Sequence, residues 1–185
     1  MPHFYSADKE PVVKVEIKGR VQRIGVVSDT HVPSRAHCLP PELLKGLEGV
    51  DLILHAGDLV DESVLLDLQA LAPVEAVAGN MDPPHLHERL KRKKLVQAGG
   101  ILIGLIHGDG GMRRSTRQRA EEAFRSFRPQ AIIFGHIHQP LCEYSGPTLI
   151  FNPGSCVDPR WSERPSYGIL HVKPDGTVSG DLIYL

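Results

Sequence analysis

The chain has 185 residues, of which 41% are hydrophobic and 23% charged, with 21 Lys and Arg against 22 Asp and Glu. This composition fits one soluble globular domain, and the formal net charge of -1 argues against a broad basic surface for long nucleic acid. The apolar runs are too short to span a membrane and the N-terminus lacks a secretion signal, so we expect a cytoplasmic protein.

Three cysteines, Cys38, Cys142 and Cys156, are scattered through the chain without C-x-x-C spacing. An odd number at such positions favours neither a disulfide framework nor a zinc knuckle. Reduced thiols in the cytosol are therefore expected, and Cys156 is expected to pack as a small hydrophobic side chain.

Residues 1–20 precede the first strong strand and contain one alternating run, Val13-Lys14-Val15-Glu16-Ile17-Lys18. This segment is either an edge strand or an extension on a mobile tail. Residues 21–185 are expected to form a single domain, because no repeat, low-complexity tract or linker divides them.

The first half of the domain alternates apolar runs with helical patterns. Strands are predicted at residues 23–28, 52–56 and 74–78, and helices at residues 40–47 and 64–71. This alternation predicts a parallel βαβ core.

The second half contains strands in closer succession, with one basic helix predicted at residues 115–127. The strands are predicted at residues 101–106, 131–134, 141–144, 148–152, 167–172 and 178–184. Together the elements predict two packed mixed sheets flanked by helices.

Side chains that bind metal ions follow five of the predicted strands. The clusters are Asp29-Thr30-His31, Gly57-Asp58, Gly79-Asn80, His107-Gly108 and Gly135-His136-Ile137-His138. Any one cluster is common in loops, but all of them in this order are expected to converge at the carboxyl ends of the strands. Mixed Asp, Asn and His donors suit two divalent cations that share a bridging oxygen.

Two features support this interpretation. A glycine stands beside each cluster after the first, where the backbone is expected to turn sharply. Among these side chains only a carboxylate can span two cations with two oxygens, which favours an aspartate as the bridge.

The ordered motifs resemble those of the calcineurin-like metallophosphoesterases, D-x-H, G-D, G-N-x-[DE], H-G and G-H-x-H. The short chain and the sequence Gly79-Asn80-Met81-Asp82 resemble the small single-domain phosphodiesterase group, which also contains a retromer subunit that keeps the fold as a scaffold. The runs Asn152-Pro153-Gly154-Ser155 and Asp158-Pro159-Arg160 are similar to the closing loop of that group, so the resemblance covers residues 21–185.

The resemblance implies an α/β fold, a four-layer αββα sandwich of two mixed sheets with a dinuclear metal site at the C-terminal ends of the strands. It assigns one metal to Asp29, His31, Asp58 and His138, and the other to Asp58, Asn80, His107 and His136. Asp58 is then the bridge, and Asp58, Asn80 and His107 are the residues expected to carry the chemistry. Manganese is the expected metal, with Fe, Zn, Co or Ni as alternatives.

The chain contains neither a G-x-S-x-G elbow nor a phosphate-binding loop of the NTPase type. We therefore predict hydrolysis of a small phosphodiester by a hydroxide that bridges the two metals. Alternatives are a weakly catalytic scaffold for protein partners, or a phosphomonoesterase or nuclease of the same superfamily. The sequence is compatible with either a monomer or a homo-oligomer.

Four further polar residues have two interpretations each. Arg113, in the glycine-rich loop after His107, either contacts substrate or is a solvated helix start. Arg160 either reaches the site or holds the closing loop by a salt bridge. His55 is expected to be a hydrogen-bonded core residue or a support for the ligands, and Asp82 either supports the site or caps its own turn.

The position after Asn80 separates this chain from the wider family, in which histidine is frequent there and is implied to protonate the leaving group. Met81 occupies it here, and a thioether donates no proton. His85 and His87, expected in a loop after Pro83-Pro84, are the candidate substitutes.

Overall fold

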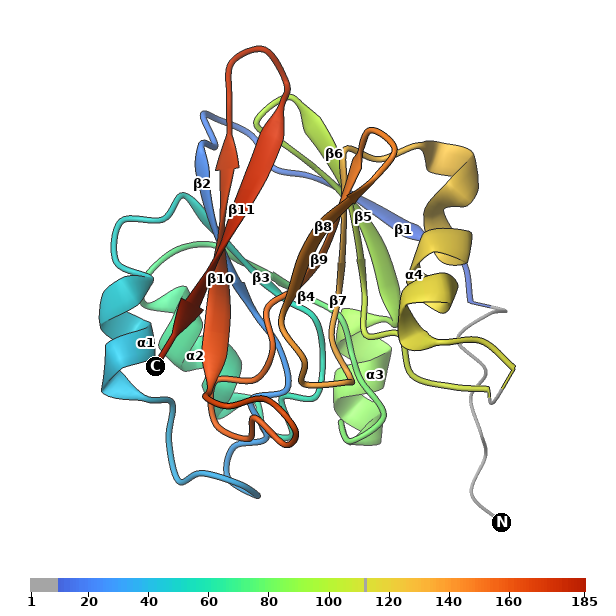
Figure 1. The fold of residues 1–185 in the computed structure, drawn as a ribbon. Helices are drawn as coiled ribbons and strands as arrows, with labels where there is room; N and C mark the ends of the chain where they lie inside the picture. Colours follow the sequence, from blue (N-terminus) through green and yellow to red (C-terminus); the bar gives the residue numbers. More distant parts are fainter. Residues whose placement is uncertain (1–9, 112) are drawn as a thin grey trace.

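The computed structural model describes residues 10–111 and 113–185. Two mixed β-sheets, one of five strands and one of six, lie at the centre of the molecule. Helices α1 and α2 flank one side and α4 flanks the opposite side (Figure 1). The predicted four-layer sandwich is therefore confirmed.

The five-stranded sheet has the order β11-β10-β2-β3-β4. Its strands are β2 (Arg23–Val27), β3 (Leu52–His55), β4 (Val74–Ala76), β10 (Ser166–Val172) and β11 (Val178–Tyr184). Strands β2, β3 and β4 are parallel, as the alternating pattern predicted, and α1 (Pro41–Gly46) and α2 (Ser63–Gln69) connect them. The carboxyl ends of these three strands therefore face the same way.

The six-stranded sheet has the order β1-β5-β6-β7-β9-β8. Its strands are β1 (Val13–Glu16), β5 (Lys93–Ala98), β6 (Ile101–Ile106), β7 (Ala131–Phe134), β8 (Leu141–Ser145) and β9 (Thr148–Asn152). Strands β6, β7 and β9 are parallel, whereas β1 pairs with β5 at the edge of the sheet. Residues 1–9 of the N-terminal segment lie outside the described residues.

Helix α3 (Pro84–Leu90) and strand β5 had no counterpart in the sequence-based expectation. His85 and His87 lie on α3 rather than in a loop, so that expectation was wrong. The pair Pro83-Pro84 is typical of a turn, but proline is also compatible with the first turn of a helix. Strand β5 was missed because its first two residues are lysines.

Helix α4 (Thr116–Phe124) continues into the 3₁₀ helix η2 (Arg125–Phe127), in agreement with the helix predicted over residues 115–127. Ser115 accepts a hydrogen bond from the Gln118 N–H and the Gln118 side chain returns one to Ser115, which forms a capping box. Phe124 packs over Gly104, where a Cβ would lie 2.5 Å from the ring. This contact fixes the fourth layer on the six-stranded sheet.

One large apolar cluster lies between the two sheets and includes Val26, Leu54, Ile103, Ile133 and Phe151. Because strands of both sheets contribute to it, the cluster holds the loops after β2 and β3 beside those after β6 and β7. Cys156 is buried in the cluster on the helical side of the five-stranded sheet, and all three cysteines are free. Among the described residues, no helix is long and apolar enough to cross a membrane.

Candidate metal centre

The loops that leave β2, β3, β4, β6 and β7 carry all the predicted metal ligands. These residues are Asp29, His31, Asp58, Asn80, His107, His136 and His138. The loops of the five-stranded sheet carry Asp29, His31, Asp58 and Asn80. The loops of the six-stranded sheet carry the three histidines His107, His136 and His138. The candidate site therefore lies where the two sheets meet.

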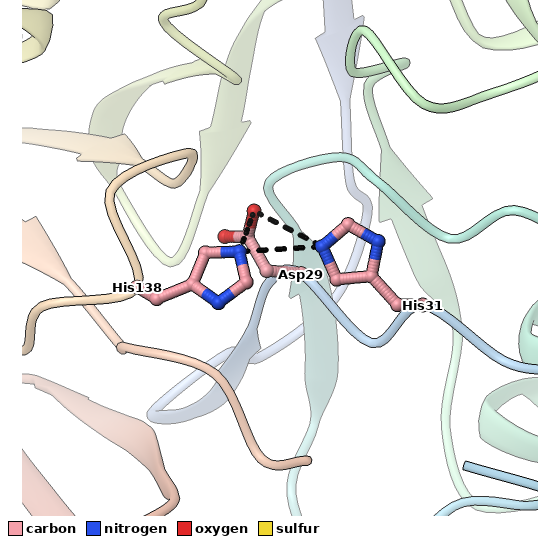
Figure 2. Close-up of side chains that lie close together, drawn as sticks. All are labelled: Asp29, His31 and His138. Atoms are coloured by element: carbon pink, nitrogen blue, oxygen red, sulfur yellow. Dashed lines mark hydrogen bonds and ion pairs between the residues drawn. The ribbon is translucent and has the colours of Figure 1, made fainter. Parts of the chain in front are cut away.

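One group of ligand-type atoms consists of Asp29, His31 and His138, all of them buried (Figure 2). Asp29 Oδ1 lies 3.2 Å from His138 Nε2 and 3.9 Å from His31 Nε2. The two imidazole Nε2 atoms are themselves 3.2 Å apart. These three atoms are close enough to bind a single cation.

A second group contains Asp58 and His107, whose Oδ2 and Nε2 atoms are 3.3 Å apart. Asn80 Oδ1 lies 3.2 Å from the same His107 Nε2. The ring of His136 stands edge-on to the ring of His107, with 5.2 Å between their centroids. The carboxylate of Asp29 also lies within reach of Asp58 and His107, so the two groups are contiguous.

The Asp58 carboxylate lies between the two groups. Its Oδ2 atom is 3.7 Å from His31 Nε2 and 3.3 Å from His107 Nε2. Its Oδ1 atom accepts a hydrogen bond from the Met81 N–H at 2.8 Å. The sequence led us to expect a bridge through both oxygens, whereas here one oxygen faces both groups and the other is held by the backbone.

Backbone carbonyls fix the orientation of two of the imidazoles. His107 Nδ1 lies 2.8 Å from the Ala56 carbonyl oxygen, and His138 Nδ1 lies 2.5 Å from that of Asp158. Donation of each Nδ1–H to its carbonyl directs the Nε2 atom toward the site, where it can bind a cation once it carries no proton. This arrangement is the usual one around metal-binding histidines.

The protonation states differ among the ligand-type residues, and a cation that binds at His107 would have to displace a proton. Although burial opposes their charge, the His138 imidazole beside Asp29 and the His107 imidazole beside Asp58 hold the pKa values of these two carboxyls below the ordinary range. Burial also opposes charge on His107, yet hydrogen bonding to Asp58 and the nearby carboxylates raise its pKa to about 9. Burial lowers the pKa of His31 and of His136, which keeps both rings neutral and able to offer a lone pair.

Five of the seven ligand-type residues adopt positive φ angles. The values are 53° for Asp29, 45° for His31, 59° for Asp58, 71° for His136 and 57° for His138. Left-handed backbone at a non-glycine residue costs free energy, about 1–3 kcal/mol where it is strained. Such a concentration at one site is typical of functional loops that the rest of the fold holds in place.

The glycines beside the ligands serve two purposes. Gly57 and Gly108 have φ angles of 97° and 91°, in agreement with the expected sharp turns. Gly79 and Gly135 are required for space instead, because a Cβ would lie 2.1 Å from Asp58 Oδ1 and 1.9 Å from Ser28 Oγ, respectively. At these two positions we expected glycine because of a sharp turn, and that reason was wrong.

Asp82 supports the site rather than only capping its own turn. Its Oδ2 atom accepts hydrogen bonds from the N–H groups of Asp58 at 3.0 Å and Gly79 at 2.8 Å, and Oδ1 accepts one from Val60 at 2.7 Å. Burial raises the pKa of Asp82 above its ordinary value. One carboxylate thus joins the loops after β3 and β4.

His55 is a buried hydrogen-bonded histidine and not one of the ligand groups. Its Nδ1 accepts the Gly57 N–H at 3.1 Å, and its Nε2 lies 3.1 Å from the Thr30 hydroxyl. Burial lowers its pKa to about 3, so the ring is neutral. It therefore supports the loops that carry Asp29 and Asp58.

The two arginines predicted as substrate contacts have different surroundings. Arg160 donates to the His136 carbonyl at 3.4 Å, and its Nε lies 3.9 Å from Asp158 Oδ2, so it holds the closing loop at the rim of the site. Arg113 is exposed in the loop before α4. Within the described part of the chain, no hydrogen bond or ion pair joins it to the ligand-type residues.

Several supporting residues were missed from the sequence. Ser28 Oγ donates to Asp29 Oδ2 at 2.5 Å, and Ser155 Oγ donates to the Asp29 carbonyl at 2.7 Å. A buried ion pair joins Arg92 to Asp109, two residues after His107. Ser155 lay in the recognised closing loop, but Arg92 carried no local signal because its partner is 17 residues away.

The residues fit two divalent cations. Asp29 Oδ1 is buried and has no hydrogen bond of acceptable geometry among the described residues, although two imidazoles lie beside it. Such an atom is costly to bury unless a positive charge or a donor approaches it. Mixed carboxylate, amide and imidazole donors suit Mn, Fe, Zn, Co or Ni.

A sequence profile described as the calcineurin-like phosphoesterase superfamily domain matches residues 23–175. A probable metallophosphoesterase of Methanothermobacter thermautotrophicus is 39% identical over 149 residues, which cover 80% of this chain and 85% of that protein. A phosphodiesterase of Methanocaldococcus jannaschii is 27% identical, with 82% and 93% covered. The structure of vacuolar protein sorting 29 from Cryptosporidium parvum superposes with a TM-score of 0.74 at 18% identity, covering 90% of this chain and 99% of that one.

We expect Asp82→Asn to lower stability by about 2 kcal/mol, because the amide NH₂ must face at least one of the three backbone donors. The melting temperature should fall by about 4–8 °C, measured by calorimetry. The control is Asp67→Asn, a change at an exposed residue of α2, which should leave the melting temperature within about 1–2 °C of the wild type. Equal effects of the two substitutions would contradict the role assigned to Asp82.

We expect Mn²⁺ to raise the melting temperature, because a cation that binds only the folded state stabilises it by about 2.7 kcal/mol at a hundredfold excess over Kd. For a chain of this size the shift is about 5–11 °C. His136→Ala/His138→Ala should lose most of it, whereas His37→Ala, at an exposed histidine, should keep it. If the double variant responded like the wild type, the cation would bind elsewhere.

Proposed function

The chain belongs to the calcineurin-like phosphoesterase superfamily, and from the side chains at its site we infer that it hydrolyses a small phosphodiester with two divalent metal ions. The observation that carries this proposal is the position of Asp58, whose Oδ2 atom faces both groups of ligand-type atoms. A single oxygen between two cation sites suits a dinuclear hydrolase. The three free cysteines fit the reducing cytoplasm, where we place this activity.

In this proposal, one cation is held by Asp29, His31, Asp58 and His138. The other is held by Asp58, Asn80, His107 and His136. When bound, two such ions generate a nucleophile from water near neutral pH and offset charge on the phosphoryl oxygens. Manganese is our first choice of metal, with Fe, Zn, Co or Ni as alternatives.

The protein's own groups hold and orient the reactants. His107 and His138 keep their Nδ1 protons on backbone carbonyls, so their Nε2 atoms stay directed into the site. The exposed Asn80 turns its Oδ1 toward His107, which leaves its amide N–H groups to donate to a phosphoryl oxygen. The buried apolar cluster between the sheets excludes water from beneath the site.

Two observations favour a diester over a monoester. The M. jannaschii relative named as a phosphodiesterase aligns over 93% of its length. A monoester dianion also calls for additional cationic side chains. At the rim, Arg160 is already engaged by Asp158 and His136, and within the described part of the chain Arg113 makes no contact with the site.

The Met81 position should determine which leaving groups the protein accepts. The Met81 N–H is bound to Asp58, and its side chain is 54% exposed beside Asn80. A thioether donates no proton, so a basic leaving group forgoes the roughly 10²- to 10⁴-fold acceleration that general acid catalysis provides. Of the two histidines on α3, His85 is exposed and His87 is partly buried.

We expect the rate to fall steeply with leaving-group pKa across a series of aryl phosphodiesters assayed at saturating metal. Met81→His should flatten that dependence by restoring a proton donor, whereas Met81→Leu, which has no donor, should leave the slope unchanged. A flat dependence in the wild type would show that an acid is present. A selective loss of rate on the esters with poor leaving groups in His85→Ala or His87→Ala would then identify that acid.

We expect Asp58→Ala to abolish hydrolysis of bis(p-nitrophenyl) phosphate, because the shared oxygen serves both cations at once. Removal of metal by a chelator should have the same effect, and Asp67→Ala on the surface of α2 should retain full turnover. Near-wild-type turnover by Asp58→Ala or by the chelated protein would refute the two-metal proposal. Bound metal without turnover on any ester would favour the scaffold alternative.

A further inference from the structure

The chain's only tryptophan, Trp161, is 88% exposed in the loop between β9 and β10. We propose that its indole is a stacking surface for a planar aromatic group, a nucleobase above all, carried by the phosphodiester substrate. Trp161 would thereby determine which esters the site accepts. This inference rests on the proposed function and specifies its substrate class.

The residues on either side of Trp161 contact the backbone of two ligand-type histidines. Arg160 donates to the His136 carbonyl at 3.4 Å, and Ser162 Oγ donates to the His138 carbonyl at 3.2 Å. The loop therefore runs along the segment that carries both imidazoles. Trp161, between these two contacts, stands at the rim of the site.

The turn that presents the indole is held at several points. The Ser162 N–H donates to the Pro159 carbonyl at 2.8 Å, and the Asp158 N–H donates to Ser155 Oγ at 2.9 Å. The Asp158 carbonyl accepts from His138, and Arg160 has a left-handed φ of 50°. Because the turn is already ordered, a stacked ligand would lose little free energy in fixing it.

The distribution of exposed apolar side chains points to the same place. Single exposed hydrophobic residues are common on protein surfaces and do not by themselves indicate a binding site. Five large ones are exposed among the described residues, and Leu66, Tyr144 and Tyr184 lie on α2, β8 and β11, outside the site. The other two, Met81 and Trp161, lie in loops that contain candidate ligands or contact them.

An indole suits this role because it is large, flat and nearly inflexible, and every nucleobase offers it a π-face. Replacing such a stacking residue with alanine weakens binding by about tenfold or more. The negative charge of the ester is to be met at the metal centre, so the ring adds affinity for the organic part of the substrate. A role at the metal centre itself would affect turnover instead.

The first test uses the fluorescence of Trp161, the only tryptophan in the protein. With the protein loaded with Zn²⁺, which is diamagnetic, thymidine 5′-monophosphate should change the emission saturably, whereas ribose 5-phosphate, which lacks the base, should leave it unchanged. Phenyl phosphate distinguishes a general aromatic site, which would respond to both rings, from one selective for nucleobases. If neither thymidine 5′-monophosphate nor phenyl phosphate changed the emission, the inference would be overturned.

The second test compares two esters that share the p-nitrophenol leaving group, one with thymidine 5′-monophosphate and one with ethyl phosphate as the retained part. Trp161→Ala should raise KM for the nucleotide ester about tenfold while kcat changes little, and Trp161→Phe should recover most of the loss. KM for the ethyl ester should stay the same. Leu66→Ala, at another exposed apolar residue, should affect neither ester.

The outcomes separate this inference from the proposed activity. Binding of thymidine 5′-monophosphate through Trp161 without hydrolysis would keep the stacking surface and refute the enzyme. Hydrolysis with the same KM in Trp161→Ala, or an equal KM increase for both esters, would refute the stacking surface alone. A change of oligomeric state in Trp161→Ala, measured by light scattering with KM unaltered, would assign the indole to a subunit contact and overturn the inference.

Discussion

The contact between the Asp29 carboxylate and the loop after β7 is the interaction on which the site depends. Asp29 lies in the loop after β2 of the five-stranded sheet, yet its Oδ2 atom accepts the His136 N–H at 3.0 Å and its Oδ1 atom lies 3.2 Å from His138 Nε2. Both of those residues lie in the loop after β7, a strand of the six-stranded sheet. A buried carboxylate therefore joins the two halves of the sandwich, and its charge must be met from both.

Other contacts repeat this connection and explain how strained loops persist. His107, after β6, bonds to the Ala56 carbonyl after β3, and Ser155, after β9, bonds to the Asp29 carbonyl after β2. Asp82 ties together the loops after β3 and β4. Each left-handed residue costs about 1–3 kcal/mol where it is strained, so it persists only when several such contacts determine its conformation. The apolar cluster between the sheets makes this possible, because it fixes the strand ends before the loops begin.

The ligand-type residues of the site could be predicted from the sequence, with His55, Asp82 and Arg160 as candidate supports, whereas other supporting residues could not. The ligand-type residues were recognisable because each follows an apolar run, and parallel strands bring such positions together. The ion pair of Arg92 with Asp109 was not, because only the folded chain brings these two residues together. Asp82 was a candidate support, but the backbone groups that it binds are defined only by the fold. Helix α3 was missed for a similar reason: Pro83-Pro84 ends one element and begins another, and the sequence supports both interpretations.

The ligand-type residues and their neighbouring glycines, which form the floor of the site, are therefore under different constraints from the exposed side chains at its rim. On the floor, Gly79 and Gly135 leave no space for a Cβ and Asp58 has both oxygens engaged, so few substitutions are compatible with the geometry. At the rim, Met81 and Trp161 are largely exposed and their side chains can change without disturbing that geometry. The ligand-type residues can thus keep the same chemistry while the exposed side chains at the rim change which ester is accepted. We therefore expect Met81 and Trp161 to determine the ester preference of this chain.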